Sequence, residues 1–515
     1  MPNQRKDPLF QLIGTLTKAE KRNFTLFVNR TNTKEEAKFI RLFDVLDGMK
    51  TFDERIIFKK VPEIKKAQLS NMKANLYKQI LVSLRLNHIH HNVDIQLREN
   101  IDYAKVLYNK GLYQQSLKLL NKAKIQAMES KQNTLVLQIL EFEKLIESQY
   151  ITRSISNRAD ELVHQTVEFN RTIQTSNSLS NLALQLYGLY LKMGYIRNEE
   201  DHHRVKFFME RNLPQVEEDN LSFFEKLYLY QSQVWYNHII HDFVMSYRYA
   251  QKWVDLFKNN ASMIELQPTL YLKGLHNLLA TLFNLRHYSK FVLVLKELDE
   301  VSKNESIKLN QNIEILLFLY SATHRINKHF LEGSFTEGVK FIPELERDLE
   351  KYVDYLDPHR VLIFYYKIAS IYFGSGDNLK AIKYLEKVLG YKDVSLREDI
   401  HCFARILNLI AHYDEGLDES LEYHVKSVYH FLGKMNDLHA VQKEIFSFLK
   451  KLNRITVHGL KGEFKDLRDR LLVYQNDIYE QRPFLYLDII SWLESKIDNV
   501  PIQQVLISKF KDSLR

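Results

Sequence analysis

The chain has 515 residues, of which 45% are apolar and 12% aromatic, and it contains only 15 glycines and 9 prolines. This composition excludes a disordered chain and disfavours an all-β fold, because core-forming residues are plentiful and chain-breaking residues are few. A single cysteine, Cys402, excludes an intramolecular disulfide and a cysteine-based zinc ribbon, and with a start that lacks an apolar signal segment it predicts a cytoplasmic protein without membrane contact.

Residues 1–93 are predicted to form a small basic helical domain. Residues 1–100 contain 19 Lys and Arg against 11 Asp and Glu, whereas the remainder has 53 of each, so the net charge of +8 lies in this region. These basic residues could contact phosphates or could form an ordinary solvated surface, and the sequence allows both interpretations. No helix-turn-helix or zinc-finger motif accompanies them. The candidate basic patch comprises Lys18, Lys21, Arg22, Lys65 and Lys66.

A helical-hairpin array is predicted over residues 94–435. In YAKVLYNKGLYQQSLKLLNKAK, residues 103–124, two amphipathic stretches flank Gly111, and Ser116 stands where the two helices would cross. Residues 364–389, FYYKIASIYFGSGDNLKAIKYLEKVL, repeat this pattern with a glycine turn at Gly374 and Gly376. Between them, residues 131–330 keep helical periodicity without these small residues, with an expected turn near Arg286-His287.

The order of small and apolar residues in these two segments resembles the tetratricopeptide (TPR) repeat family. The matching residues are Ala369, Tyr372, Gly376, Asp377, Ala381 and Leu385, with Ala104, Gly111, Tyr113, Ser116, Leu120 and Ala123 as the second match. The resemblance implies an all-α, right-handed TPR-like α-solenoid of stacked helical hairpins. Turn-plus-crossing units recur at Gly338, Ala381 and Ser420, 43 and then 39 residues apart. Since a regular TPR unit has about 34 residues, we expect longer helices here, with residues 436–515 capping the stack.

In TPR proteins the first helix of each hairpin lines a groove that binds a partner. Carrying this over predicts a groove that contains Lys105, Tyr108, Tyr366, Ser370, Phe373, Arg405 and His412. Tyr366 and Ser370 do not match the Lys and Asn with which chaperone-binding members hold a carboxylate, so that activity is not implied. The aromatic residues of 223–236 and 364–373 are too numerous for one core contact, and we expect some of them to be exposed.

Catalytic and metal-binding motifs give no strong signal. The glycine pair at 374–377 lacks the Lys-Ser/Thr and the preceding strand of a phosphate loop, so a turn is the better interpretation. His238 and His241 are predicted to share a helical face. The pair could bind a metal or could be partly buried without a ligand, and the sequence allows both interpretations. His401 and Cys402 are neighbours on a helix and should point in different directions, which disfavours a catalytic dyad. We expect no cofactor and no enzymatic activity.

These observations favour a non-enzymatic scaffold that binds a peptide or helix of a partner protein on a helical surface. The alternative is a regulator whose basic residues 1–93 bind nucleic acid while the array senses a peptide or protein. A hydrolase or transferase with an unrecognised site is the third possibility, and it would require convergent ionisable groups that the sequence does not display.

Overall fold

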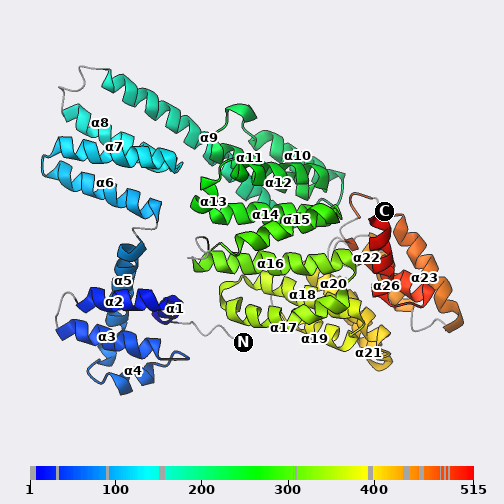
Figure 1. The fold of residues 1–515 in the computed structure, drawn as a ribbon. Helices are drawn as coiled ribbons and strands as arrows, with labels where there is room; N and C mark the ends of the chain where they lie inside the picture. The colour runs from blue at the N-terminus through cyan, green and yellow to red at the C-terminus, as the bar shows by residue number, and fades with distance from the viewer. Residues whose placement is uncertain are drawn as a thin grey trace. The chain divides into compact units, whose positions relative to one another are not determined.

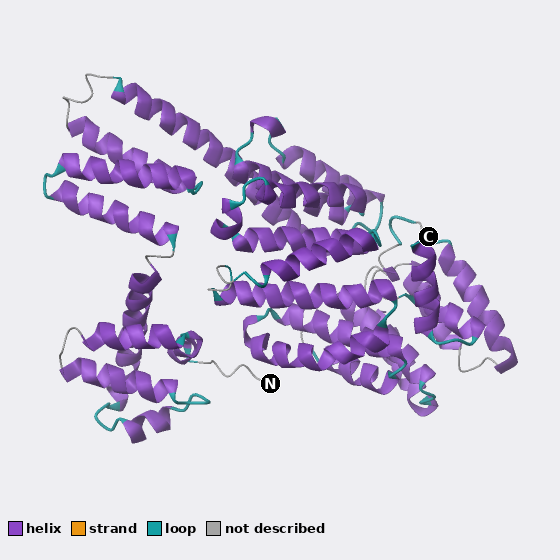
Figure 2. Cartoon of the chain, in the orientation of Figure 1, coloured by secondary structure: helices purple, strands orange, loops and turns teal. Residues whose placement is uncertain are grey.

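The computed structural model describes an all-α protein (Figures 1 and 2). The described residues are 7–29, 34–88, 92–149, 157–304, 307, 310–391, 398–432, 440–451, 457–475, 477–480, 483–484 and 488–514. Within these ranges the chain forms 25 α-helices and no strand, as the composition predicted. No helix in this part of the chain is both long enough and apolar enough to cross a membrane. The chain divides into two compact units, residues 1–173 (unit 1) and 174–515 (unit 2).

The first five helices of unit 1 form their own core. They are α1 (Pro8–Thr15), α2 (Lys18–Asn29), α3 (Lys34–Asp47), α4 (Glu54–Lys60) and α5 (Lys66–His88). Ile13, Phe24, Leu42 and Leu76 lie at its centre, one from each of four helices. The buried face of α5 repeats at three- and four-residue intervals, which explains why this segment is helical and packs against α1, α2 and α3.

The remaining helices of unit 1 pack in sequence. They are α6 (Val93–Asn109), α7 (Tyr113–Glu129), α8 (Asn133–Gln149) and the start of α9 (Arg158–Met193), in which the division between the units falls. The expected hairpin of residues 103–124 is confirmed: α6 and α7 pack together, and Gly111 adopts a φ of 75° between them. At the helix crossing, the buried hydroxyl of Ser116 donates to the carbonyl of Ala104 over 2.8 Å.

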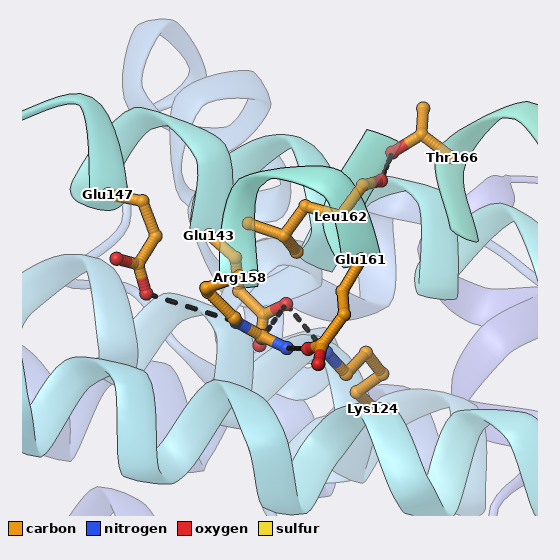
Figure 3. A network of polar contacts seen from close by, with 7 residues as sticks. All are labelled: Lys124, Glu143, Glu147, Arg158, Glu161, Leu162 and Thr166. Carbon is orange, nitrogen blue, oxygen red and sulfur yellow. Dashed lines mark hydrogen bonds and ion pairs between the residues drawn. The ribbon is translucent and has the colours of Figure 1, made fainter. Parts of the chain in front are cut away.

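A buried ion-pair network joins α7, α8 and α9 (Figure 3). Nζ of Lys124 lies 2.6 Å from Oε2 of Glu143, and Nη2 of Arg158 lies 3.2 Å from the same oxygen. Arg158 also pairs with Glu161 on its own helix, at 3.1 Å. Figure 3 shows these side chains converging in the space between the helices. Glu147 and Lys124 lie on opposite sides of Arg158. Lys124, which is buried, and Arg158, which is partly buried, therefore each have a carboxylate within reach.

Unit 2 continues the sequential packing. Its helices up to the last hairpin are α10 (Glu199–Asn212), α11 (Phe223–Ile239), α12 (Phe243–Lys258), α13 (Ser262–Leu266), α14 (Pro268–Asn284), α15 (Tyr288–Val301), α16 (Gln311–Glu332), α17 (Phe335–Tyr352), α18 (Pro358–Ser375), α19 (Asn378–Leu389), α20 (Glu398–Asp414) and α21 (Asp418–Leu432). From α14 to α20, consecutive helices contact one another, and the first helices of successive hairpins, α14, α16, α18 and α20, also pack together. This pattern is consistent with a helical repeat.

The turns between paired helices share one backbone conformation. The expected hairpin of residues 364–389 is confirmed, and Gly376 closes α18 with a φ of 87°. The expected turn near Arg286 is also confirmed, with Arg286 at a φ of 52°, and His241 has a φ of 62° between α11 and α12. Thus the middle of the chain keeps the left-handed turn residue even where glycine is absent. Gly374, expected to lie in the turn, instead belongs to α18, where a Cβ would lie 2.5 Å from the ring of Phe335.

The expectation that some aromatic residues of 223–236 and 364–373 are exposed is wrong for the described chain. In α11, Phe223 and Tyr230 are buried and the other aromatic side chains are partly buried; in α18, only Tyr365 is partly buried and the rest are buried. The reason is that α18 has neighbours on several sides, namely α16, α17, α19 and α20, so its apolar surface extends well beyond one stripe.

The carboxy-terminal helices return to the array. They are α22 (Ala440–Lys451), α23 (Val457–Leu472), α25 (Ile489–Asp498) and α26 (Ile502–Ser513). α26 packs against α25 and also against α16 and α18, more than 120 residues earlier in the sequence. Oε1 of Gln503 accepts hydrogen bonds from the amide and the hydroxyl of Thr336, at 2.8 and 2.9 Å. α26, the last described helix, therefore packs against helices from the middle of the array.

Candidate functional site

A cavity of about 420 Å³ lies within unit 2. Its walls come from α14, α16, α18, α20 and α26, together with residues near the carboxy-terminal end of α9. Most of the lining side chains are apolar or aromatic, including Phe283, Phe330, Phe373, Leu506 and Phe510. A volume of this size suits a small organic molecule or one to a few side chains of a partner.

One face of α18 provides the centre of the cavity wall. Arg360, Lys367, Ser370 and Gly374 follow one another at intervals of seven, three and four residues, which places them on a single stripe of the helix. Arg360 and Lys367 are the only Lys or Arg residues in α18, and the helix contains no Asp or Glu. The stripe that faces the cavity is thus positively charged.

A chain of hydrogen bonds holds Lys367 in place. Nζ of Lys367 donates to Oδ1 of Asn327 over 2.6 Å, and Nδ2 of Asn327 lies 3.5 Å from Nδ1 of His324. Nε2 of His324 lies 2.8 Å from Nδ1 of His276, whose ring stacks on Tyr320. Because lysine can only donate, Asn327 must donate to His324, which assigns the Nε2 proton to His324 and leaves Nδ1 of His276 as the acceptor.

Burial leaves these groups poorly solvated. It lowers the pKa of Lys367 to about 8 and the pKa of His324 to about 3, and it also lowers the pKa of His276. For both histidines the nearby positive charge of Lys367 acts in the same direction as burial. Both imidazoles are therefore neutral near pH 7. In this series of hydrogen-bonded side chains, the positive charge is on Lys367.

The described cavity lining contains one carboxylate, Asp488, and a further lysine, Lys509, and each has another partner. Asp488, which lines the cavity, caps the start of α25 by accepting from the amide of Ser491 at 3.1 Å. Lys509 of α26 also lines the cavity but pairs with Glu494 at 2.6 Å. No described carboxylate forms an ion pair with Arg360 or Lys367.

α26 closes one side of the cavity. Leu506, Lys509 and Phe510 contribute to the lining, and the ring of Phe510 meets Tyr288 edge-on at a centroid distance of 4.8 Å. Gly333 allows this approach, because a Cβ there would lie 2.9 Å from the backbone nitrogen of Ile507. No residue of α26 is fully buried, so the helix covers the site while remaining partly accessible itself.

Three of the seven expected groove residues, Tyr366, Ser370 and Phe373, line the cavity. Arg405 and His412 lie on α20 and do not line it: the guanidinium of Arg405 stacks over Phe431 at 4.0 Å, and His412 is buried with Nδ1 2.8 Å from the carbonyl of Asn408. The last two belong to unit 1, where Lys105 is exposed and Tyr108 donates to Gln149 at 3.0 Å.

The candidate basic patch lies on α2 and around the start of α5. Lys21 pairs with Asp47. The other four residues, Lys18, Arg22, Lys65 and Lys66, are exposed and have no carboxylate partner among the described residues. Most of the patch is thus available to an anionic partner.

The histidine pair at 238 and 241 differs from expectation. The two residues do not share a helical face, because α11 ends at Ile239 and His241 lies in the turn that follows. Instead they flank Tyr195, whose hydroxyl lies 3.1 Å from Nε2 of His238. Among the described residues no group of three or more His, Cys, Asp or Glu side chains could hold a metal. His401 and Cys402 are both buried on α20, and Cys402 accepts from Gln442 at 3.1 Å.

Comparisons with protein-family models, with curated proteins and with solved structures found no match. Arg360 and Lys367 were missed by sequence reasoning, although a signal for them exists. They are the only Lys or Arg residues in a helix of strongly apolar character, and they share a stripe with Ser370. Isolated cations on such a helix are unusual unless they serve a buried or cavity-facing role.

Proposed function

We propose that this chain is a TPR-like array of helical hairpins that acts as a non-enzymatic, cytoplasmic scaffold. In this proposal a peptide or helix of a partner protein binds where Tyr366, Ser370 and Phe373 line the cavity. Sequential helix packing and the recurrent left-handed turn residue support the array.

The observation that carries the proposal is the packing of α26 against the array. An amphipathic helix from a distant part of the chain lies against the first helices of two successive hairpins, α16 and α18. It inserts apolar side chains such as Leu506 and Phe510 into the lining of the cavity. This is the arrangement of helix-in-groove recognition, and it supports a surface suited to a helix of similar character.

Site-specific photocrosslinking tests this proposal. Benzoylphenylalanine is placed at Ser370 in the full chain, and in a control at Leu293, an α15 side chain that is 68% exposed. After irradiation in the organism's own cell extract, we expect a defined protein to crosslink through position 370 and not through position 293. Addition of the chain without the photocrosslinker should reduce this crosslink. The same proteins at both positions, or none at 370, would contradict the proposal.

One observation supports the nucleic-acid alternative: four basic residues of the candidate patch are exposed and have no carboxylate partner in the part of the chain that the structure describes. Phosphate contacts weaken steeply as salt rises. We therefore compare DNA and RNA affinity of the full chain at low and high salt with that of a variant in which Lys18, Arg22, Lys65 and Lys66 are changed to Gln. A salt-sensitive affinity that the variant loses would favour the regulator; equal affinities would eliminate it.

A further inference from the structure

Cations that are buried or partly buried have different partners in the two units. In unit 1, Lys124 and Arg158 both contact the carboxylate of Glu143, at 2.6 and 3.2 Å. In unit 2, Arg360 and Lys367 have no described carboxylate partner. An enclosed charge without a counter-ion is unfavourable, so its presence in a cavity indicates a site that an external anion completes.

A second cation of the same region strengthens this contrast. Lys273 on α14 is partly buried, and both burial and the nearby positive charge of Arg360 lower its pKa. It also has no described carboxylate partner. Cations from two helices, Lys273 on α14 and Arg360 and Lys367 on α18, thus all lower the pKa of the buried His276, and Arg360 also lowers the pKa of Lys273.

The hydrogen-bond donors needed for an anion are present in the cavity lining. Lys367 uses one of its three N–H groups on Asn327, and the chain through His324 and His276 fixes that bond. The described structure gives the side chain of Arg360 no hydrogen bond, so its five N–H groups stay available. The two residues are two helical turns apart on one face, about 10 Å along the axis, and their long side chains can approach one bound group from either side.

The rest of the cavity determines what carries the anionic group. The ring of Phe330 lies 5.2 Å from Nζ of Lys367 and that of Phe283 lies 5.9 Å away, so the ammonium group stands against aromatic walls. Phe373, Leu506 and Phe510 add apolar side chains to the lining. About 420 Å³ is sufficient for a small molecule with one charged end.

We propose that this cavity binds a small organic anion, a carboxylate, sulfonate or phosphate group on an apolar body, with Arg360 and Lys367 holding the anionic group and the aromatic walls holding the body. This site shares the cavity with the proposed peptide site, so the two ligands would compete there. The inference does not depend on the scaffold proposal, because it requires no partner protein.

Fluorescence titration of the purified full chain tests the site. The probe is 1-anilinonaphthalene-8-sulfonate, and N-phenyl-1-naphthylamine serves as the neutral probe with the same aromatic body. We expect K367M and R360M each to weaken binding of the sulfonate at least about tenfold, because each removes a charge-assisted hydrogen bond, and to leave the neutral probe within about twofold. K340M, which removes an exposed lysine on α17, serves as the matched control and should change neither affinity.

Competition on the unaltered chain keeps the inference testable if a variant folds poorly. Sodium decanoate should displace the sulfonate probe at a concentration at least about tenfold lower than 1-decanol or decyltrimethylammonium, because only decanoate offers an oxyanion to the two cations. Equal displacement by the three amphiphiles, or undiminished sulfonate binding in K367M and R360M, would overturn the proposal.

Discussion

The ammonium group of Lys124 lies 2.6 Å from the carboxylate of Glu143, and the two side chains are 6% and 1% exposed. Both charges are therefore removed from water, and each depends on the other for solvation. Such a pair adds little net stability compared with apolar residues, but loss of one partner leaves the other charge buried. The geometry leads to a prediction for each single variant and for the double variant.

Glu143→Leu should lower the free energy of unfolding of unit 1 by about 3 kcal/mol, because Lys124 is left buried without a carboxylate. Adding Lys124→Met should restore most of that loss. The measurement is urea denaturation followed by circular dichroism. Arg98→Met provides the control, since the pair of Arg98 with Asp94 on α6 is exposed and should contribute less than about 0.5 kcal/mol. Additive losses in the double variant would contradict this account.

The turn residues give a prediction in which one substitution has opposite effects at two sites. Gly376 has a φ of 87°, so Gly376→Ala should lower the free energy of unfolding by about 1 kcal/mol or more. Gly462 lies inside α23 with open space around it, so Gly462→Ala should raise that free energy by about 0.5 to 1 kcal/mol. Thermal and urea unfolding measure both. A stabilising effect at position 376 would show that the left-handed turn is not needed there.

The sequence was sufficient for the helical hairpins because their signals are local. Glycine at 111 and 376, and small residues at the crossings, mark each hairpin within about 25 residues. In the middle of the chain the same turns carry Lys131, His241 and Arg286 at positive φ, so the glycine signal disappears while the geometry remains. These residues tolerate the conformation because tertiary packing of the two helices compensates for the local strain.

The site could be predicted only in part. The resemblance to TPR repeats placed Tyr366, Ser370 and Phe373 in a groove, and all three line the cavity on α18. The partners of Lys367 were not predictable, since Asn327 lies 40 residues away on another helix, and His276 lies a further 48 residues from His324. Nor does any local pattern indicate that α26 returns to cover α16 and α18.

His238 predicts a loss of stability in mild acid. Burial lowers its pKa to about 4 in the folded chain, against an ordinary value of 6.5 for a solvated histidine. Below pH 6.5 the unfolded chain therefore takes up a proton that the folded chain does not, so stability is complete above pH 6.5 and falls as the pH drops toward 4. Between pH 7.5 and 5.0 this histidine should account for about 2 kcal/mol of lost unfolding free energy.

The test compares His238→Phe with the natural chain by urea denaturation at pH 7.5 and 5.0. The ring of phenylalanine suits the aromatic surroundings of Tyr190, Tyr195 and Trp235. We expect the difference between the two pH values to shrink by about 2 kcal/mol in this variant. His164→Gln, which removes an exposed imidazole on α9, should leave the difference as it is in the natural chain. An unchanged difference in His238→Phe would refute the assignment.

Lys367 and Lys124 predict opposite outcomes for the same substitution. Lys124→Met removes a paired cation and should destabilise unit 1, because Glu143 then keeps only Arg158. Lys367→Met removes an enclosed cation that no described carboxylate neutralises, and it should raise the free energy of unfolding of unit 2 by about 1 to 2 kcal/mol, after allowance for the lost hydrogen bond to Asn327. Differential scanning calorimetry at pH 7 measures both changes. If Lys367→Met destabilised unit 2, the positive charge of Lys367 would have to be neutralised within the chain, and the reason for an external anion would disappear.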